Sequence, residues 1–321
     1  MLKKMYMRKI LITSLTLFVF ALLCLMPSKK DNTIDTIDSE VTYVYENNLA
    51  VVYLLDKNNY VARTKISSLS DDDIIAKVRD LVETLIIDGK KNEIIPNGFR
   101  PIIPSGTSIK DISLSDGILK LDFSKEFLDT NIELEEKMIE ALTYTLTNIE
   151  GIKGIIIYVE GELLNKLPLS KKILPTFLDR NFGINKVYDI SSINSIDSIT
   201  CFYVSSFNDT YYYVPVTKYF NNNNDDKVKI IVEELKTSSS YESNLMSYLN
   251  VNTKLLNYEI NDNIARLNFN DMIFFDMNDK SILEEVVYTI SLSFDSLYDI
   301  EEIDFLVNGE EIYKSVVKDI E

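Results

Sequence analysis

The fold is decided by a short strand pattern that occurs twice, as Leu119-Lys120-Leu121-Asp122-Phe123 and as Ala265-Arg266-Leu267-Asn268-Phe269. In both copies apolar side chains alternate with polar ones, which is typical of a strand with one face in a core. Two further stretches repeat in the same order: Tyr144-Thr145-Leu146 with Tyr288-Thr289-Ile290, and Val159-Glu160-Gly161 with Val307-Asn308-Gly309. The offsets are 146, 144 and 148 positions. A repeat of nearly fixed period predicts two copies of one structural module.

Around these stretches the first copy, residues 70–161, reads as helix, two strands, helix and strand. Ser70 is predicted to cap the first helix, Asp71 to Asp73 to lie in its first turn, and Gly89 to end it. Asp116-Gly117 indicates a hairpin turn. The other elements are expected at strands 42–45, 50–55, 60–64, 108–114, 118–123 and 155–159, and at a helix over 134–148.

The second copy, residues 224–309, follows the same order. Residues 211–218 are expected to form a strand like that at 59–65, with helices over 228–235 and 279–293 and a turn at 262–263. The predicted fold class is therefore α+β, with two tandem repeats in αββαβ order, each a mixed or antiparallel sheet with two helices on one face. The predicted boundaries are a membrane segment at 1–27, a polar tether at 28–40, domains at 41–165 and 196–321, and a linker at 166–195.

The 321-residue chain carries 33 basic and 50 acidic residues, a net charge of −17. Six bases and no acid fall in residues 1–30, so the remainder has 27 bases against 50 acids, or −23. Such a body repels phosphate backbones, and we expect no nucleic-acid partner. The chain has no histidine, which excludes His-dependent nucleophiles and His-based zinc sites. No cofactor or metal site is predicted.

An apolar run from Ile10 to Met26 follows four bases. It is long for the core of a signal peptide and short for a membrane span. We expect it to anchor the chain in the cell membrane, with the N-terminus cytoplasmic and the bulk extracytoplasmic. Two alternatives stay open: lipidation at Cys24, although Leu23 before it departs from the small residue expected there, or cleavage and release. Cys201, the other cysteine, is predicted to be buried in a strand.

The many carboxylates raise the question of hydrolysis or calcium binding. Asp122 becomes Asn268 in the second copy, and Glu160 becomes Asn308, so neither belongs to an obvious catalytic pair. The three aspartates at 71–73 are interpreted as helix-capping residues, and the Asn- and Asp-rich stretch at 221–226 as a solvated loop and helix cap. The row Tyr211, Tyr212 and Tyr213 must turn at least one ring outward if it forms a strand, and is a candidate interaction surface. The alternative is that these are ordinary strand-forming residues.

Several stretches together carry a family resemblance: Ile103-Pro104-Ser105-Gly106-Thr107, Asp116-Gly117-Ile118-Leu119-Lys120-Leu121-Asp122, Thr143-Tyr144-Thr145-Leu146-Thr147, Val159-Glu160-Gly161 and Leu174-Pro175-Thr176-Phe177-Leu178-Asp179-Arg180. Their order resembles tandem GerMN domains of sporulation and spore-germination proteins, over nearly the whole chain outside the anchor. The second copy lacks the Pro-Ser-Gly segment and has Asn250-Val251-Asn252-Thr253 there. The resemblance implies a membrane-tethered, extracytoplasmic protein with no catalytic residues to carry over, and modules similar to ring-building motifs.

These observations predict a non-enzymatic scaffold of sporulation or germination. It is expected to bind other envelope proteins, or itself in a ring, in the space between forespore and mother-cell membranes. Two other functions stay open. One is a carboxylate-dependent enzyme or regulator acting on cortex peptidoglycan. The other is a small-ligand receptor that uses the cleft between the two copies.

Overall fold

The computed structural model describes residues 49–67, 73–237 and 244–320. The predicted anchor and tether, Cys24, the strand expected at 42–45, and the proposed helix cap Ser70 with Asp71 and Asp72 lie outside these residues. Among the helices that the structure does describe, none has the length and apolar character needed to cross a membrane.

Each repeat contains a four-stranded sheet of the same topology. In the first repeat it is formed by β4 (Ile109–Ser115), β5 (Ile118–Phe123), β6 (Gly154–Val159) and β7 (Glu162–Leu163). The second repeat uses β11 (Leu255–Asn261), β12 (Ile264–Phe269), β13 (Glu302–Val307) and β14 (Glu310–Val316). In both sheets the central pair is parallel and the outer pairs are antiparallel. The predicted α+β repeats and their mixed sheets are thus present.

A further sheet of six strands is built by both repeats and one strand of the linker, β8 (Val187–Asp189). Its other strands are β1 (Leu49–Asp56), β2 (Val61–Ser67), β3 (Phe99–Arg100), β9 (Ile196–Phe207) and β10 (Thr210–Asn221). The hairpin β1–β2 of the first repeat meets the hairpin β9–β10 of the second where Arg63 pairs with Tyr213. We expected one sheet for each repeat, and the shared sheet is an addition to that picture.

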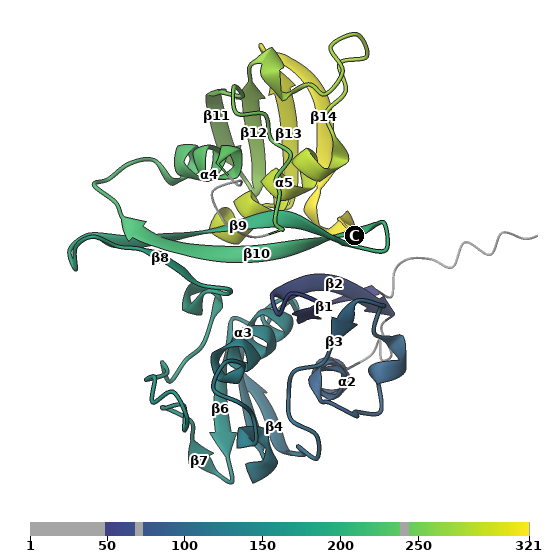
Figure 1. Cartoon of the computed structure of the whole chain (residues 1–321), viewed down its shortest axis with the longest axis vertical. Helices are drawn as coiled ribbons and strands as arrows, with labels where there is room; N and C mark the ends of the chain where they lie inside the picture. The colour runs from purple at the N-terminus through teal and green to yellow at the C-terminus, as the bar shows by residue number, and fades with distance from the viewer. Residues whose placement is uncertain (1–48, 68–72, 238–243, 321) are drawn as a thin grey trace, which may run out of the picture. The chain divides into compact units, whose positions relative to one another are not determined.

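The helices of each repeat lie between two sheets (Figure 1). In the first repeat, α2 (Ile74–Leu85) and α3 (Glu135–Leu146) pack on the four-stranded sheet and on β1, and their apolar faces join one core. In the second, α4 (Lys227–Lys236) and α5 (Glu284–Tyr298) pack on β9, and they share a core with β12 and β13. Short 3-10 turns occur at Asn92–Ile94, Lys125–Leu128, Arg180–Phe182, Asp271–Ile273 and Val317–Asp319.

Local signals place α2 slightly later than expected. Its N-cap is Asp73, whose carboxylate accepts the amide of Ile75 at 3.0 Å. The helix ends at Leu85, four residues before Gly89. Gly89 was predicted to end this helix, but its role in the structure is different. A Cβ there would lie 2.2 Å from the Glu83 carbonyl oxygen, so the position requires glycine for a close backbone approach.

The last helix was predicted over 279–293 but runs over Glu284–Tyr298. Residues before it form a turn instead, in which Asp276 bridges Ser281 and its carboxylate accepts the amide of Asn278 at 2.7 Å. The structure also changes the alignment of this helix with α3, the corresponding helix of the first repeat. Thr145 accepts the amide of Tyr53 from β1, and Ser293 accepts the amide of Phe202 from β9, both at 2.9 Å. Thr145 therefore corresponds to Ser293 and not to Thr289. A slip of four residues keeps the same helix face, which is why the sequence match looked plausible.

Candidate functional site at the joint between the repeats

The three consecutive tyrosines do not share one environment. Tyr211 is 51% exposed and packs edge-on against Tyr248, with ring centroids 6.3 Å apart. Tyr212 and Tyr213 are each only 5% exposed. The expectation of at least one outward ring is met by Tyr211. Burial removes Tyr212 and Tyr213 from the candidate interaction surface.

The two buried tyrosines lie at the joint between the repeats, where Tyr213 of β10 pairs with Arg63 of β2. The Tyr212 hydroxyl donates to Oδ2 of Asp56, across 156 positions, at 2.9 Å, and accepts from the Ser205 hydroxyl. Burial raises the pKa of Tyr212 to about 12, and the neighbouring Asp56 carboxylate acts in the same direction. The Tyr213 ring packs edge-on against Tyr288 of α5 with centroids 5.9 Å apart. Burial keeps both phenols neutral, and the Tyr212 hydroxyl also bonds across the joint.

Asp122, weighed above as a catalytic acid, holds a turn. Its Oδ1 accepts the amide of Gly161 at 3.0 Å. In the second repeat, Oδ1 of Asn268 accepts the amide of Gly309 at 2.9 Å. Because an amide oxygen serves as well as a carboxylate oxygen, the position requires an acceptor and not a charge. The exchange of Asp for Asn between the repeats follows directly from this geometry.

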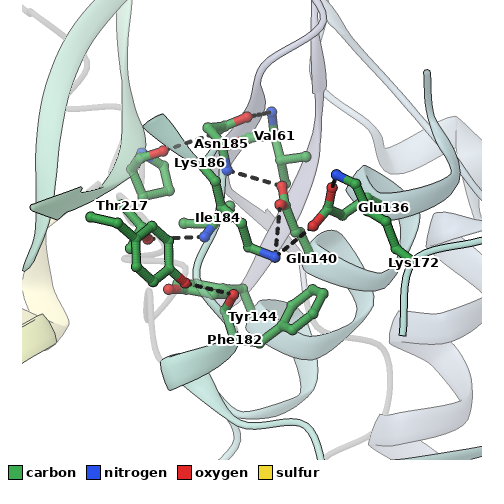
Figure 2. Close-up of polar contacts among 12 residues, drawn as sticks. Val61, Glu136, Glu140, Tyr144, Lys172, Phe182, Ile184, Asn185, Lys186 and Thr217 are labelled. Atoms are coloured by element: carbon green, nitrogen blue, oxygen red, sulfur yellow. Dashed lines mark hydrogen bonds and ion pairs between the residues drawn. The ribbon is translucent and has the colours of Figure 1, made fainter. Parts of the chain in front are cut away.

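The linker is anchored to both repeats by Asn185 (Figure 2). Its Oδ1 accepts the amide of Val61 at 3.0 Å, and its Nδ2 donates to the carbonyls of Val61 and Pro215 at 2.8 and 2.7 Å. Val61 lies on β2 of the first repeat and Pro215 on β10 of the second. Asn185 is buried and has φ 46°, in the left-handed region that asparagine tolerates. One side chain thus bonds to both halves of the shared sheet.

Three glutamates of the first repeat hold the linker against α3. The carboxylate of Glu135 accepts the amides of Leu169 and Ser170 at 2.7 and 2.8 Å. Glu140 accepts the amide of Asn185 at 2.9 Å. Glu136 pairs with both Lys172 and Lys186, the latter at 2.9 Å (Figure 2). Acids on amphipathic helices ordinarily lie on the polar face of the helix, and this was our interpretation of most acids in the chain. For Glu135 and Glu140, which are 1% and 2% exposed, that interpretation was wrong.

The second repeat has no equivalent of this arrangement. With the 148-position offset that relates Thr145 to Ser293, Glu135 corresponds to Leu283 and Glu140 to Tyr288. The sequence signal for Glu135 and Glu140 was therefore that the second repeat has no acid at the corresponding positions. The four-residue error in aligning the two helices hid this difference. The acids at these two positions are specific to the helix on which the linker packs.

The carboxylates differ in their tendency to ionise. Burial raises the pKa of Glu140 to about 7, against the opposing effects of Lys186 and the Asn185 amide. Burial also opposes ionisation of Glu136, but hydrogen bonds and charges from Lys172 and Lys186 outweigh it and lower the pKa. The same balance lowers the pKa of Glu135, where donors from Ser170 and Leu169 outweigh burial.

A cleft of about 340 Å³ opens beside this network. Its lining combines three acids, three lysines and two tyrosines: Tyr60, Ile132, Glu133, Glu136, Lys137, Glu140, Ser170, Lys172, Asn185, Lys186, Val187 and Tyr188. Equal numbers of acidic and basic groups leave it close to neutral. Within the described residues, no cluster of three or more acidic or cysteine side chains could hold a metal ion.

Two further contacts complete the joint. Nη2 of Arg63, on β2, donates to the carbonyl of Ile320 at 2.8 Å, which ties the end of the second repeat to the first. The Thr217 hydroxyl of β10 accepts the amide of Ile184 from the linker at 2.9 Å (Figure 2). Hydrogen bonds therefore join the first repeat to the linker, the linker to the second repeat, and the two repeats to each other.

Comparison with known proteins gives consistent matches. The profile of the family described as Germane, sporulation and spore germination, matches residues 51–165 and 200–313. The chain is 30% identical over 263 residues to the spore germination protein GerM of Bacillus subtilis (strain 168), covering 81% of this chain and 71% of that protein. It superposes with a TM-score of 0.75 and 29% identity on the tandem GerMN domains of the sporulation protein GerM from Bacillus subtilis, covering 82% of this chain and 91% of that one. The expected tandem GerMN arrangement is confirmed.

Proposed function

Since this chain belongs to the Germane family of sporulation and spore-germination proteins and carries two GerMN domains in tandem, we propose that it is a non-enzymatic scaffold. In this role it is anchored in the membrane through residues 10–26, with its N-terminus in the cytoplasm. Its two domains stand outside the membrane and bind other envelope proteins of the sporulating cell. Lipidation at Cys24 is the alternative mode of anchoring.

The observation that carries the proposal is the locked joint. The two repeats contribute to one six-stranded sheet, and Asn185 bonds to a strand of each. A scaffold must present its binding surfaces at a fixed spacing, and a buried, hydrogen-bonded joint supplies that. Of the carboxylates considered for hydrolysis, Asp122 holds a turn and Glu160 accepts the amide of Lys125 at 2.9 Å. These structural roles favour the scaffold over a peptidoglycan-cleaving enzyme.

The exposed Tyr211 is the position at which we expect contact with a partner protein or with a second copy in a ring. A photo-crosslinking amino acid at position 211 in sporulating cells should trap a discrete adduct in the membrane fraction. The same residue at 213, which faces Tyr288, is the matched control and should give only an internal crosslink. Recovery of the chain as a freely diffusing monomer, with no adduct from 211, would contradict the scaffold role.

The second candidate, a small-ligand receptor, was expected to use a cleft between the two copies. The cleft beside α3 is the specific observation that favours a receptor, but its lining comes from the first repeat and the linker. Its mixture of paired charges and aromatic side chains fits small zwitterions such as amino acids or short peptides. A thermal-shift screen of the full-length chain with such compounds should then raise the unfolding temperature. Absence of any shift with both amino acids and peptides would remove this candidate.

A further inference from the structure

The contact between Glu140 and Asn185 combines three properties. The Glu140 carboxylate is buried, it lies at the joint between two repeats, and its bonding partner is the linker residue that holds both repeats. Anything that changes the charge of Glu140 therefore acts on the attachment of the linker. The inference shares the Asn185 joint with the scaffold proposal, but it concerns the ionisation of Glu140, which that proposal does not use.

Few groups are placed to stabilise the negative charge of an ionised Glu140 carboxylate. Oε2 accepts one amide hydrogen bond, from Asn185. Oε1 lies 3.6 Å from Nζ of Lys186, which is held more closely by Glu136 at 2.9 Å. The titratable and charged groups that face Glu140 come from α3, the linker, β8 and β10: Glu136, Lys137, Lys172, Lys186, Tyr188 and Tyr219. A buried carboxylate with so few donors is costly to ionise.

We propose that Glu140 and Asn185 form a pH-sensitive latch: the linker is held most tightly to α3 and to both repeats when the Glu140 carboxyl is protonated, and the latch loosens when that carboxyl ionises. The bond from the Asn185 amide can form in either state, because the carbonyl oxygen of a protonated carboxyl still accepts. Protonation removes the buried charge while keeping the bond.

The direction of the pH effect follows from the linkage between proton binding at Glu140 and attachment of the linker. With the linker attached, the pKa of Glu140 is about 7, whereas in a detached state, where water reaches the side chain, it returns towards its ordinary value of 4.5. The attached state thus binds the proton more tightly, so its stability is full below about pH 4.5 and is lost as the pH rises through 7. Between pH 6 and pH 8 these two values correspond to an increase of about tenfold in the population of the detached state.

Amide hydrogen exchange of the full-length chain tests the latch directly. Protection factors, which are corrected for the intrinsic pH dependence of exchange, would be measured at pH 6 and pH 8 for the amides of Asn185 and Val61. We expect protection to fall about tenfold over this range. The amide of Tyr53, bonded to Thr145 in the core of the first repeat, should not change by more than a small factor and serves as the reference.

The variant Glu140→Gln mimics the protonated carboxyl, and we expect it to keep strong protection at both pH values. Glu135→Gln is the matched control, because Glu135 holds the other end of the linker but its pKa is lowered. This variant should weaken protection at Leu169 and Ser170 equally at pH 6 and pH 8. The wild-type pH dependence at Asn185 should survive in it.

Two results would overturn the latch: equal protection of Asn185 at both pH values in the wild type, or an undiminished fall in Glu140→Gln. If Glu140→Gln does not fold, the titration of the carboxyl carbon of Glu140 in the isotope-labelled wild type decides the matter. A midpoint near pH 7 supports the latch, and a midpoint below pH 5 refutes it.

Discussion

Asn185 is the side chain on which the joint between the repeats most depends. Its amide group makes three hydrogen bonds, to partners 124 and 30 positions away in the sequence. It also adopts a positive φ that most residues avoid. The sequence contains this asparagine in an unremarkable stretch of the linker. Its role could not be predicted, because nothing local to the chain indicates which distant backbone groups it will meet.

Replacing Asn185 by glycine should isolate the side-chain bonds, because glycine accepts the same backbone conformation without strain. The change leaves buried backbone groups of Val61 and Pro215 without partners, so the free energy of unfolding should fall by about 2–4 kcal/mol. Urea denaturation of the full-length chain measures it. Asn208→Gly is the control, since Asn208 has a similar φ of 47° but is exposed. Equal effects of the two variants would show that the Asn185 bonds contribute little.

The turn at Asp122 offers a complementary test of a single atom. Asp122→Asn should change the free energy of unfolding by less than about 0.5 kcal/mol, because Asn268 makes the same bond in the second repeat. Asp122→Ala removes the acceptor for the Gly161 amide and should cost about 1 kcal/mol. Thermal or urea unfolding compares the three proteins. A large loss in Asp122→Asn would mean that the charge itself matters, contrary to the structural role.

Among the secondary-structure elements, those with strong local patterns were predicted best. The hairpin of β4 and β5 follows from alternation and from Asp116-Gly117, whose φ values of 56° and 81° suit that turn. The start of α5 was predicted five residues early, since the apolar spacing of residues 282 and 283 continues the helical pattern although both precede the helix. Helical periodicity indicates a face but does not locate the first residue.

Substitutions at two threonines on α3 can distinguish how much a helix-to-strand hydrogen bond contributes to stability and how much burial contributes. Both are fully buried, but Thr145 accepts the Tyr53 amide, whereas the Thr143 hydroxyl has no partner among the described residues. Thr145→Val should lower the free energy of unfolding by about 1–3 kcal/mol, because it leaves the buried amide of Tyr53 without an acceptor. Thr143→Val should leave stability unchanged or raise it slightly.

Urea unfolding of the two variants gives the comparison. Ser293, which accepts the Phe202 amide, occupies the corresponding place on α5, so Ser293→Ala should resemble Thr145→Val in direction. Equal losses in Thr143→Val and Thr145→Val would mean that side-chain packing, and not the hydrogen bond to the strand, sets the stability of this layer.

At the scale of the whole molecule, the described residues form a core for each repeat and a sheet that belongs to both. The repeats, their order and their family were legible in the sequence. The joining of β2 to β10 was not, because strands pair through backbone groups that every residue carries, and side-chain patterns say little about which edge meets which. The roles of Glu135 and Glu140 on α3 were missed for a related reason: their hydrogen-bond donors are backbone amides of the linker.

The shared sheet predicts how the full-length chain unfolds. We expect a single calorimetric transition for the two repeats, because Asn185, Tyr212 and Arg63 couple them. The double variant Asn185→Gly, Tyr212→Phe removes the Asn185 side-chain bonds and the bond between Tyr212 and Asp56, and should split the transition into two. Asn208→Gly should keep one. Two independent transitions in the wild type would contradict coupling through the joint.

The differing environments of the three tyrosines have a practical consequence. The chain contains no tryptophan, so a single indole introduced here would fluoresce without background from any other indole. Tyr211→Trp would place it in contact with solvent and with whatever approaches, and Tyr213→Trp would place it beside Tyr288 inside the closed seam. Two neighbouring positions on one strand thus provide separate optical reporters, one for encounters with other molecules and one for the integrity of the protein itself.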